Sequence, residues 1–404
     1  MRTFQLAWRN IWRNRRRTLV TVGAMTIALV CTTLYGAMVQ GYLATLERDA
    51  LDAEMGVAQV FAPGYQERPS IYAVIPDADA LVARLDAAGM TACARLLGGG
   101  LVAAGESSAG AQFRGIDVQR DAAVLVVSRG VVDGAWLDEA DPAGVVLGRR
   151  LAHTLGVKPG DELVLLSQAT DGSIANQLAT VRGVLASVGE ATDRAGVFLT
   201  ARAFREFFAL EQGAHQVIVK RPDVVDLPAL EARITAAAPG QQVLTWRRLM
   251  PTVATMIDSV RGLVAFMFFI VNVAIAIVIL NAMLMAVFER IREFGILKAL
   301  GVGPLEVLRL IYAESLFQVV IALGASLVLE TPLLVLLSAR GLDMSSLAGV
   351  SAVGITMASR WYAVVGVSTF TGPAAMMFFV VAAAVLYPAA KAAVIDPVEA
   401  MRHA

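Results

Sequence analysis

The sequence has few of the residues that carry catalysis or bind metal ions. It contains 2 cysteines and 3 histidines among 404 residues, with no H-E-x-x-H motif and no cysteine pair at zinc-binding spacing. Cys31 lies in an apolar run and Cys93 in a polar region, so we expect no disulfide framework. The 34 basic and 34 acidic residues cancel, which removes the charge excess typical of nucleic-acid-binding proteins. We therefore predict no metal site and no nucleic-acid partner.

Motifs for nucleotide binding and nucleophilic catalysis are also absent. No G-x-x-x-x-G-K-[ST] sequence is present to cradle nucleotide phosphates. The segment Gly105 to Gly110 misses a G-x-S-x-G nucleophile elbow by one residue, and we interpret it as a loop, like Gly98 to Gly100. We predict that the chain is not an enzyme, has no catalytic residues and binds no cofactor itself.

The chain does contain four long apolar stretches. They cover Thr18 to Gln40, Gly262 to Phe288, Leu316 to Leu337 and Pro373 to Ala390, against the ~20 apolar residues that cross a bilayer. We predict a membrane protein with four transmembrane helices. A cleavable signal peptide is the alternative for the first stretch, but its run exceeds the usual apolar core of ~7–15 residues, so we expect an uncleaved anchor.

The distribution of basic residues predicts the topology. They cluster before the first stretch, between the second and third, and after the fourth: Arg2, Arg9, Arg13, Arg15, Arg16, Arg17; Arg290, Arg292, Lys298; Lys391 and Arg402. By the positive-inside rule both termini and the middle loop are cytoplasmic, and the insert between the first two stretches is outside. We expect a multi-pass protein of the bacterial inner (cytoplasmic) membrane with a periplasmic domain.

Two helices extend beyond the membrane toward this insert. Leu43, Leu46 and Ala53 continue the helical spacing of the first stretch, so one helix can run from Thr18 to Met55. Pro251 suits a helix start, and no breaker follows before Phe288. The insert is thus predicted to be an α+β domain on two helical stalks, which are either mechanical levers or merely long helices.

Short strands and helices are predicted within the insert. The strands are Glu162–Leu166, Gln177–Leu185, Gly196–Leu199 and Gln216–Lys220, and the helices are Val145–Leu155, Ala201–Phe208 and Leu227–Ala238.

The predicted segments of the whole chain are a cytoplasmic amphipathic segment (1–17), transmembrane helix 1 and stalk (18–56), the outer domain (57–245), stalk and helix 2 (246–288), a cytoplasmic coupling helix (289–303), helix 3 (304–339), an outer loop (340–372), helix 4 (373–390) and a cytoplasmic tail (391–404).

Polar residues inside the spans are few. Asn272 and Asn281 are nine residues apart and therefore lie on opposite faces of one helix, which suits separate interhelical hydrogen bonds. Glu330 is expected near the outer end of the third span, where its carboxylate reaches interfacial water.

The middle loop carries the most specific pattern. Ile291, Phe294, Leu297 and Leu300 recur every third residue with charges between them, which predicts a short amphipathic helix along the inner membrane surface. Gly301 can end this helix, and the next can begin at Pro304. Read without further information, it is an amphipathic linker.

The string from Glu289 to Gly301 resembles the coupling-helix signature of FtsX-like ABC transporter permeases, which include MacB-type exporters and the LolC/LolE lipoprotein-release proteins. The segments Ala7 to Thr18 and Tyr387 to Arg402 resemble the family's entry and closing motifs, and Leu147 to Asp161 resembles its outer-domain pattern. The absence of a fused ATPase and the segment Gly341 to Leu347 are most similar to the LolC/LolE group.

The resemblance implies a mechanism and partners. Two permease copies, identical or different, would form a dimer on an ABC-type ATPase subunit dimer that binds ATP and Mg, and coupling would move the stalks and outer domains (mechanotransmission). Phe294 and Leu297 would dock in the ATPase with Glu293 and Lys298 at the rim. The expected coupling residues are Arg290, Arg292, Glu293, Phe294, Gly295, Leu297, Lys298, Leu300 and Gly301.

The function implied first is lipoprotein release from the outer leaflet to a periplasmic carrier or adaptor, with membrane lipids around the spans. We expect acyl chains to contact Leu34, Met38, Phe266 and Phe269 on the first two spans. The alternatives are export of a peptide, drug or other amphiphile, and FtsX-like signalling to cell-wall hydrolases without transport.

Overall fold

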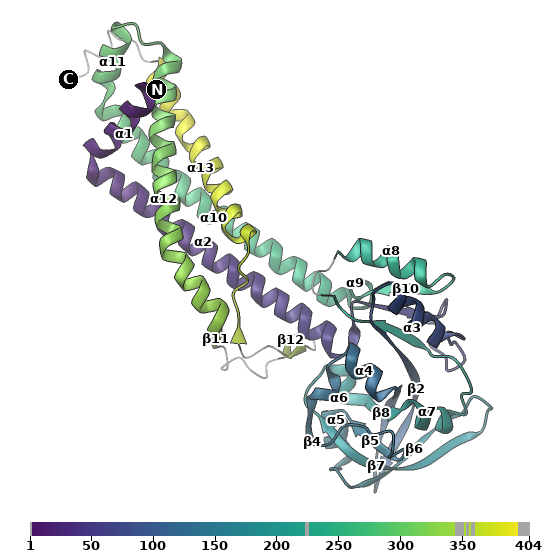
Figure 1. Ribbon diagram of the computed structural model, residues 1–404. Helices are drawn as coiled ribbons and strands as arrows, with labels where there is room; N and C mark the ends of the chain where they lie inside the picture. Colours follow the sequence, from purple (N-terminus) through teal and green to yellow (C-terminus); the bar gives the residue numbers. More distant parts are fainter. Residues whose placement is uncertain (1, 223–225, 344–350, 353–354, 357–359, 395–404) are drawn as a thin grey trace. The chain divides into compact units, whose positions relative to one another are not determined.

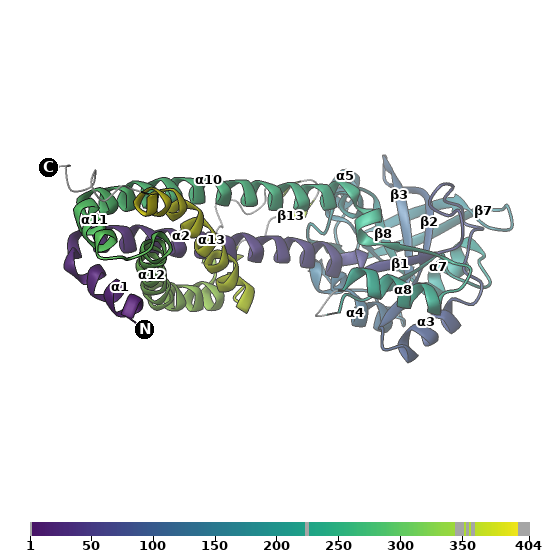
Figure 2. The same ribbon diagram turned by 90° about the horizontal axis from the view of Figure 1, so that it is seen from above.

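The computed structural model describes residues 2–222, 226–343, 351–352, 355–356 and 360–394. Two compact units divide the chain, with boundaries inside two helices, between Ala44 and Thr45 and between Met256 and Ile257. Helices labelled α1, α2 and α10 to α13 make up the membrane unit, and the ten-stranded sheet with its helices makes up the outer unit (Figures 1 and 2). Residues 344–347 of the segment from Gly341 to Leu347, and the tail from residue 395, lie outside the described residues.

The helices of the membrane unit follow the predicted apolar stretches. Their bounds are α1 Arg2–Arg13, α2 Arg15–Ala50, α10 Pro251–Glu289, α11 Ile291–Ala299, α12 Pro304–Arg340 and α13 Val367–Val394. A π-helical turn, Leu51–Met55, continues α2. Four of these helices (α2, α10, α12 and α13) are long and apolar enough to cross a membrane.

The fourth span begins earlier than predicted. We expected its start at Pro373, yet α13 begins at Val367 and contains Pro373 and Pro388. The Thr369 hydroxyl accepts a hydrogen bond from the Gly366 N–H at 3.0 Å, which is one half of a capping box at the helix start. This side-chain cap starts the helix before the apolar run becomes continuous.

Helix α2 packs along α12 in a constant parallel register. The Thr26 hydroxyl lies 3.4 Å from the Ala322 carbonyl oxygen, and Ala37 shares a buried cluster with Leu334. Glu330 lies in the same interface and is 2% exposed, so the expectation that it reaches interfacial water is wrong. The packing of α2 covers it.

The two asparagines of α10 have different surroundings. Asn272 is 7% exposed and donates to the Phe268 carbonyl oxygen at 2.8 Å, whereas Asn281 is exposed. They lie on opposite faces, as their spacing predicts, but the Asn272 hydrogen bond stays within α10, so the expectation of an interhelical bond is wrong for Asn272.

The outer unit is built on one hydrogen-bonded sheet. Its strands run in the order β10-β1-β9-β2-β3-β8-β5-β7-β4, with β6 pairing β2 and β7, and only the β3–β8 and β5–β7 pairs are parallel. The bounds are β1 Ala58–Phe61, β2 Ala92–Ala104, β3 Ser107–Ile116, β4 Val131–Gly134, β5 Gly144–Leu147, β6 Glu162–Gln168, β7 Ile174–Leu185, β8 Gly196–Thr200, β9 Gln216–Val219 and β10 Gln242–Thr245.

Short helices connect these strands. Their bounds are α3 Ala78–Ala87, α4 Val118–Val124, the 3-10 turn Val127–Gly130, α5 Arg149–Leu155, α6 Glu190–Ala195, α7 Ala201–Phe208, α8 Leu227–Ala237 and α9 Trp246–Leu249. Two further short strand pairs are described outside the ten-stranded sheet: β11 Leu342–Asp343 with β14 Arg360–Trp361, and β12 Ser351–Ala352 with β13 Ile355–Thr356. The outer domain is therefore α+β, as predicted.

The glycine-rich segments of this domain are strands. Gly98 to Gly100 lie within β2, and a Cβ atom on Gly98 would stand 2.5 Å from Cζ of Phe208. Only Gly105 and Glu106 form a turn, because β3 begins at Ser107. The glycines make room for aromatic side chains, so reading these segments as loops was wrong.

A second correction concerns the predicted helix from Val145 to Leu155. Its first residues form strand β5, and α5 begins at Arg149. Gly148 separates the two elements where the backbone passes closely over Asp193, whose Cα atom would lie 2.9 Å from a Cβ at that position. The run of valines favours a buried strand over a helix.

The end of the first stalk is fixed to the sheet by charges. Asp52 pairs with Arg221 at 3.0 Å, and Glu54 pairs with Arg114. Behind Glu54, Arg95 is 2% exposed and binds both oxygens of Asp121 at 2.7 and 3.0 Å. Because Arg95, Arg114 and Asp121 lie on β2, β3 and α4, the stalk end is bonded to the centre of the sheet.

His215 is buried as a neutral imidazole. It is 0% exposed; its Nε2 lies 2.9 Å from the Ile71 carbonyl oxygen, and its Nδ1 accepts from the Leu97 N–H at 3.0 Å. Burial lowers the pKa of His215, and the hydrogen bond to Ile71 only partly opposes this. A proton on Nδ1 would displace the Leu97 N–H.

The outer domain should lose stability as the pH falls below about 6.5, where unfolded histidine takes up a proton and buried His215 does not. Because the unfolded chain binds more protons than the folded domain in this pH range, acidification increases the unfolded population. The thermal midpoint of the detergent-solubilised protein measures this. His215→Gln should flatten the dependence, whereas His153→Gln, at an exposed position, should leave it unchanged; equal profiles for all three proteins would contradict it.

Candidate functional site: the coupling helix and its charge network

Helix α11 is closed at its end by backbone geometry. Gly301 has φ +92, the Val302 N–H bonds to the Leu297 carbonyl at 3.0 Å, and the Gly301 N–H bonds to that of Lys298 at 3.0 Å. This is the Schellman arrangement, which needs a glycine at the left-handed position. Pro304 then occupies the first turn of α12. The turn fixes how α11 is joined to the third span.

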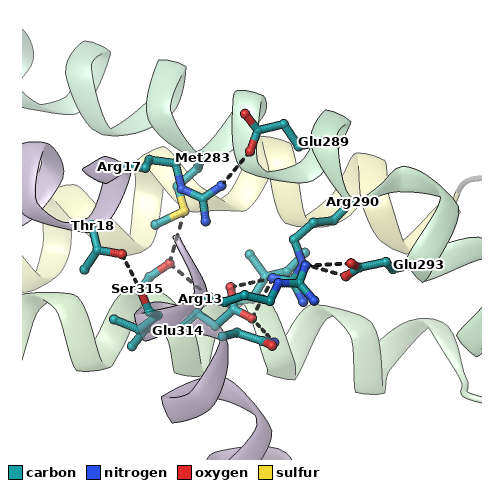
Figure 3. Close-up of polar contacts among 12 residues, drawn as sticks. Arg13, Arg17, Thr18, Met283, Glu289, Arg290, Glu293, Glu314 and Ser315 are labelled. Carbon is teal, nitrogen blue, oxygen red and sulfur yellow. Dashed lines mark hydrogen bonds and ion pairs between the residues drawn. The ribbon is translucent and has the colours of Figure 1, made fainter. Parts of the chain in front are cut away.

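Arg290, between α10 and α11, holds the centre of a charge network (Figure 3). Its Nη1 lies 2.9 and 3.1 Å from the two oxygens of Glu314 on α12, and its Nε lies 3.0 Å from Glu293 on α11. The Arg290 and Glu314 side chains are only 10% and 8% exposed. Burial alone would lower the pKa of Arg290, but Glu314 and Glu293 raise it above its usual value.

The entry helices join the same network. The amide of Asn10 on α1 donates to Glu314 at 2.6 Å, and Arg13 pairs with Glu293 at 2.6 Å. Burial opposes ionisation of Glu293, yet the hydrogen bonds from Arg290 and Arg13 lower its pKa. Glu293 therefore stays ionised and bridges two arginines.

Further contacts tie α11 and its surroundings to the remaining spans. Arg17 on α2 pairs with Glu289 at the end of α10 at 3.1 Å, as Figure 3 shows. Lys298 on α11 donates to the Ala393 carbonyl near the end of α13 at 2.8 Å. Together with Glu314, these contacts connect the coupling region to α1, α2, α10, α12 and α13.

A separate cavity of ≈ 330 Å³ lies among α2, α10 and α13. Its polar lining is uncharged and includes Thr33 and Gln40 from α2, Asn272 from α10 and Thr369 from α13. Its apolar lining includes Phe269. The cavity can hold part of an amphipathic molecule.

Comparison with known families decides the identity. Residues 18–237 match the model of the MacB-like periplasmic core domain, and residues 265–397 match the FtsX-like permease C-terminal model. The chain belongs to the family of MacB-like, FtsX-type ABC transporter permeases.

Individual proteins are also similar to parts of this chain. The permease is 27% identical over 290 residues to an uncharacterized ABC transporter permease of Methanocaldococcus jannaschii, covering 67% of this chain and 65% of that protein. It is similar to the periplasmic region of MacB from Actinobacillus actinomycetemcomitans, with 13% identity, a TM-score of 0.37 and coverage of 53% and 95%. It is also similar to the extracellular domain of the noncanonic ABC-type transporter YknZ from Gram-positive bacteria, with 13% identity, a TM-score of 0.33 and coverage of 47% and 99%.

The expected docking residues of the permease do not share one face. Phe294 is 1% exposed in the membrane core beneath Arg290 and is not available to a partner, whereas Leu297 is half-buried against the same core. Residues three apart on an α-helix are offset by about 60° around the helix axis. After three such steps, Leu300 lies on the side of the helix opposite Ile291. The exposed apolar residues are Ile296 (47%), Leu300 (77%) and, on α12, Leu305 (67%).

The other expected coupling residues divide between the two faces. Arg290, Glu293 and Lys298 face the bundle, Gly295 is buried, Arg292 is exposed, and Gly301 supplies the turn. The sequence reading missed Asn10, Glu314 and Ile296. A lone carboxylate among apolar residues, as at Glu314, was the available signal.

The expected substrate residues are not brought together either. Phe269 lines the cavity, but Leu34 and Met38 pack against the cluster of Ala37 and Leu334. Phe266 is 58% exposed and does not line the cavity. Thr33 and Gln40 lie on the face of α2 that lines the cavity, whereas Leu34 lies on a different face of the helix.

Proposed function

We propose that the permease transmits ATP-driven movement from a separate ATPase dimer to its outer domain, as one of two permease copies in a bacterial inner membrane. Both termini and α11 face the cytoplasm, and the outer domain is periplasmic. The observation that carries this proposal is the network of Arg290, Glu293 and Glu314, because it bonds α11 to the spans around it. A push on α11 therefore moves the bundle instead of bending a linker.

The surface that meets the ATPase is formed by Arg292, Ile296 and Leu300. These residues are four apart on α11, share one face and are exposed. Exposed apolar side chains beside a charge are typical anchors of a protein contact.

Leu300→Asp should therefore abolish ATPase binding without unfolding the permease. Its side chain is 77% exposed, so the change has little effect on folding, while a carboxylate in a desolvated contact costs on the order of 2–4 kcal/mol of binding energy. Co-purification with the ATPase measures the result. Ile174→Asp, at an 83% exposed outer-domain position, is the matched control; equal recovery of ATPase by both variants would contradict the docking surface.

The substrate we propose is amphipathic, first of all a lipoprotein released from the outer leaflet to a periplasmic carrier. The cavity among α2, α10 and α13 supports this, because its uncharged hydroxyl and amide groups suit a headgroup linkage and its apolar wall suits an acyl chain. Signalling without transport has no need of such a cavity.

A photo-crosslinker at Phe269 should capture a lipoprotein in the nucleotide-free complex and lose it when ATP binds. The control is a crosslinker at Phe266, three residues earlier and outside the cavity lining. Capture of lipoprotein at both positions alike would indicate general lipid contact. Capture of a soluble periplasmic protein, with no dependence on ATP, would favour the signalling alternative.

A further inference from the structure

The α2–α12 interface contains a buried carboxyl group that the coupling network does not use. Glu330 is 2% exposed, and its Oε2 has no hydrogen-bond partner in the described chain. The Thr33 hydroxyl of α2 lies next to the Glu330 carboxyl group. Ser326 and Leu334, one turn before and after on α12, are 1% and 0% exposed, so the whole face is closed.

The register of the two helices supports this placement. Thr26 meets Ala322, Thr33 meets Glu330 and Ala37 meets Leu334. Each partner on α12 lies 296 or 297 positions after its partner on α2, so the helices run side by side without a slip. Glu330 is held at one fixed level of a packed interface.

The described helices α2, α10, α12 and α13 place no cation beside Glu330 that could balance its charge. Between Arg17 and Glu47, α2 has no charged residue, and α10 has none between Arg261 and Glu289. Within α12 the next charge is Arg340, about 15 Å further along the helix. The charged residue of α13 is Lys391, near its cytoplasmic end.

The cysteine and tyrosine side chains of these helices are either exposed or make contacts with residues other than Glu330. Cys31 and Tyr387 are exposed, and the rings of Tyr35 and Tyr42 contact Phe268 and Trp361. The Tyr312 hydroxyl donates to the Ala382 carbonyl. An isolated carboxylate buried in an apolar helix bundle costs several kcal/mol or more, whereas the neutral acid can share its hydrogen with a hydroxyl.

We propose that Glu330 is a proton-binding site within the membrane. The closed interface holds the neutral acid beside Thr33, and separation of α2 from α12 lets water reach the carboxyl group, which then releases the proton. Closure and proton uptake are thereby linked, and one proton changes the closed-to-open ratio by up to tenfold per pH unit. Since α2 is also the helix that continues toward the outer domain, the pH outside biases its position. This inference does not depend on the proposed substrate.

The first test uses the purified permease–ATPase complex in liposomes and dicyclohexylcarbodiimide, which partitions into lipid and reacts with protonated carboxyl groups. Peptide mass spectrometry should find the adduct on Glu330, decreasing as the pH rises, and none on Glu314, whose carboxylate is bound to Arg290. Adducts on both residues, or an adduct on Glu330 that does not change with pH, would overturn the proposal.

The second test needs no reaction at the closed site. Glu330→Gln keeps the shape of the neutral acid but cannot ionise, so its thermal midpoint should match the wild type at low pH and exceed it increasingly as the pH rises. If the Glu330→Gln and wild-type midpoints keep a constant difference across the pH range, Glu330 does not exchange a proton between the states.

Discussion

Replacing Arg290 with alanine is expected to remove ATP-driven movement of the outer domain and to destabilise the membrane unit. Glu314, with a side chain 8% exposed, would keep only the amide of Asn10 as a partner. Breaking one half of a buried ion pair costs roughly 3–5 kcal/mol, because the remaining charge is left without compensation. The same substitution disconnects α11 from α12.

Two measurements separate these effects: the thermal midpoint, and the ATP-dependent distance between spin labels at Ile174→Cys in two permease copies. Arg13→Ala is the matched control, because its pair with Glu293 is 56% and 43% exposed and contributes about 0–1 kcal/mol. Arg290→Met combined with Glu314→Leu should recover stability, since no charge stays buried, but not movement. Normal movement in that double variant would mean that the ion pair does not couple α11 to the spans.

A proline at Leu46 is expected to stop outer-domain movement while ATP hydrolysis continues. Leu46 lies near the outer end of α2, 6% exposed, where proline removes a backbone donor and kinks the helix at a cost of ~3 kcal/mol or more. In the proposed complex, ATP hydrolysis takes place in the partner ATPase and depends on contacts at α11, which the kink leaves intact. The interrupted helix would no longer move the residues beyond it.

Leu46→Ala is the control for this variant, because it removes the same side-chain packing and keeps the helix continuous. ATPase turnover and the spin-label distance should both stay near the wild-type values in it. Movement that survives Leu46→Pro would reduce the first stalk to a tether and leave transmission to α10.

The helices of this protein could be predicted from sequence because each depends on local signals. Apolar runs longer than a bilayer specify α2, α10 and α12, and Gly301 with Pro304 specifies the end of α11 and the start of the next helix. Strand β9 and helix α7 also follow their local residue preferences closely. These features need no knowledge of distant contacts.

What could not be predicted depends on partners far away in the sequence. Arg290 meets Glu314 only because α11 folds back against α12, and Asn10 joins them across 304 positions. Gly98 and Gly100 are accommodated in a strand where the aromatic rings of Phe208 and Phe113 lie close to them. The burial of Phe294 and Glu330 likewise follows from helix packing, which hydrophobic spacing alone does not specify.

The positions at which the chain enters and leaves the outer sheet have a mechanical consequence. Strand β1 starts three residues after the π-helical turn, and β10 ends just before α9; the two are antiparallel, with Ala58 opposite Thr245. Forces carried by the two stalks therefore act on neighbouring ends of one strand pair. When both stalks move their strand ends equally, the sheet moves as a rigid body. When the stalks pull the two ends in opposite directions along the strands, all four residue pairs between β1 and β10 are loaded in shear at once. When the stalks move apart sideways, the hydrogen bonds between β1 and β10 break one after another, starting at Ala58. The domain resists the first two loads and is weakest against the third.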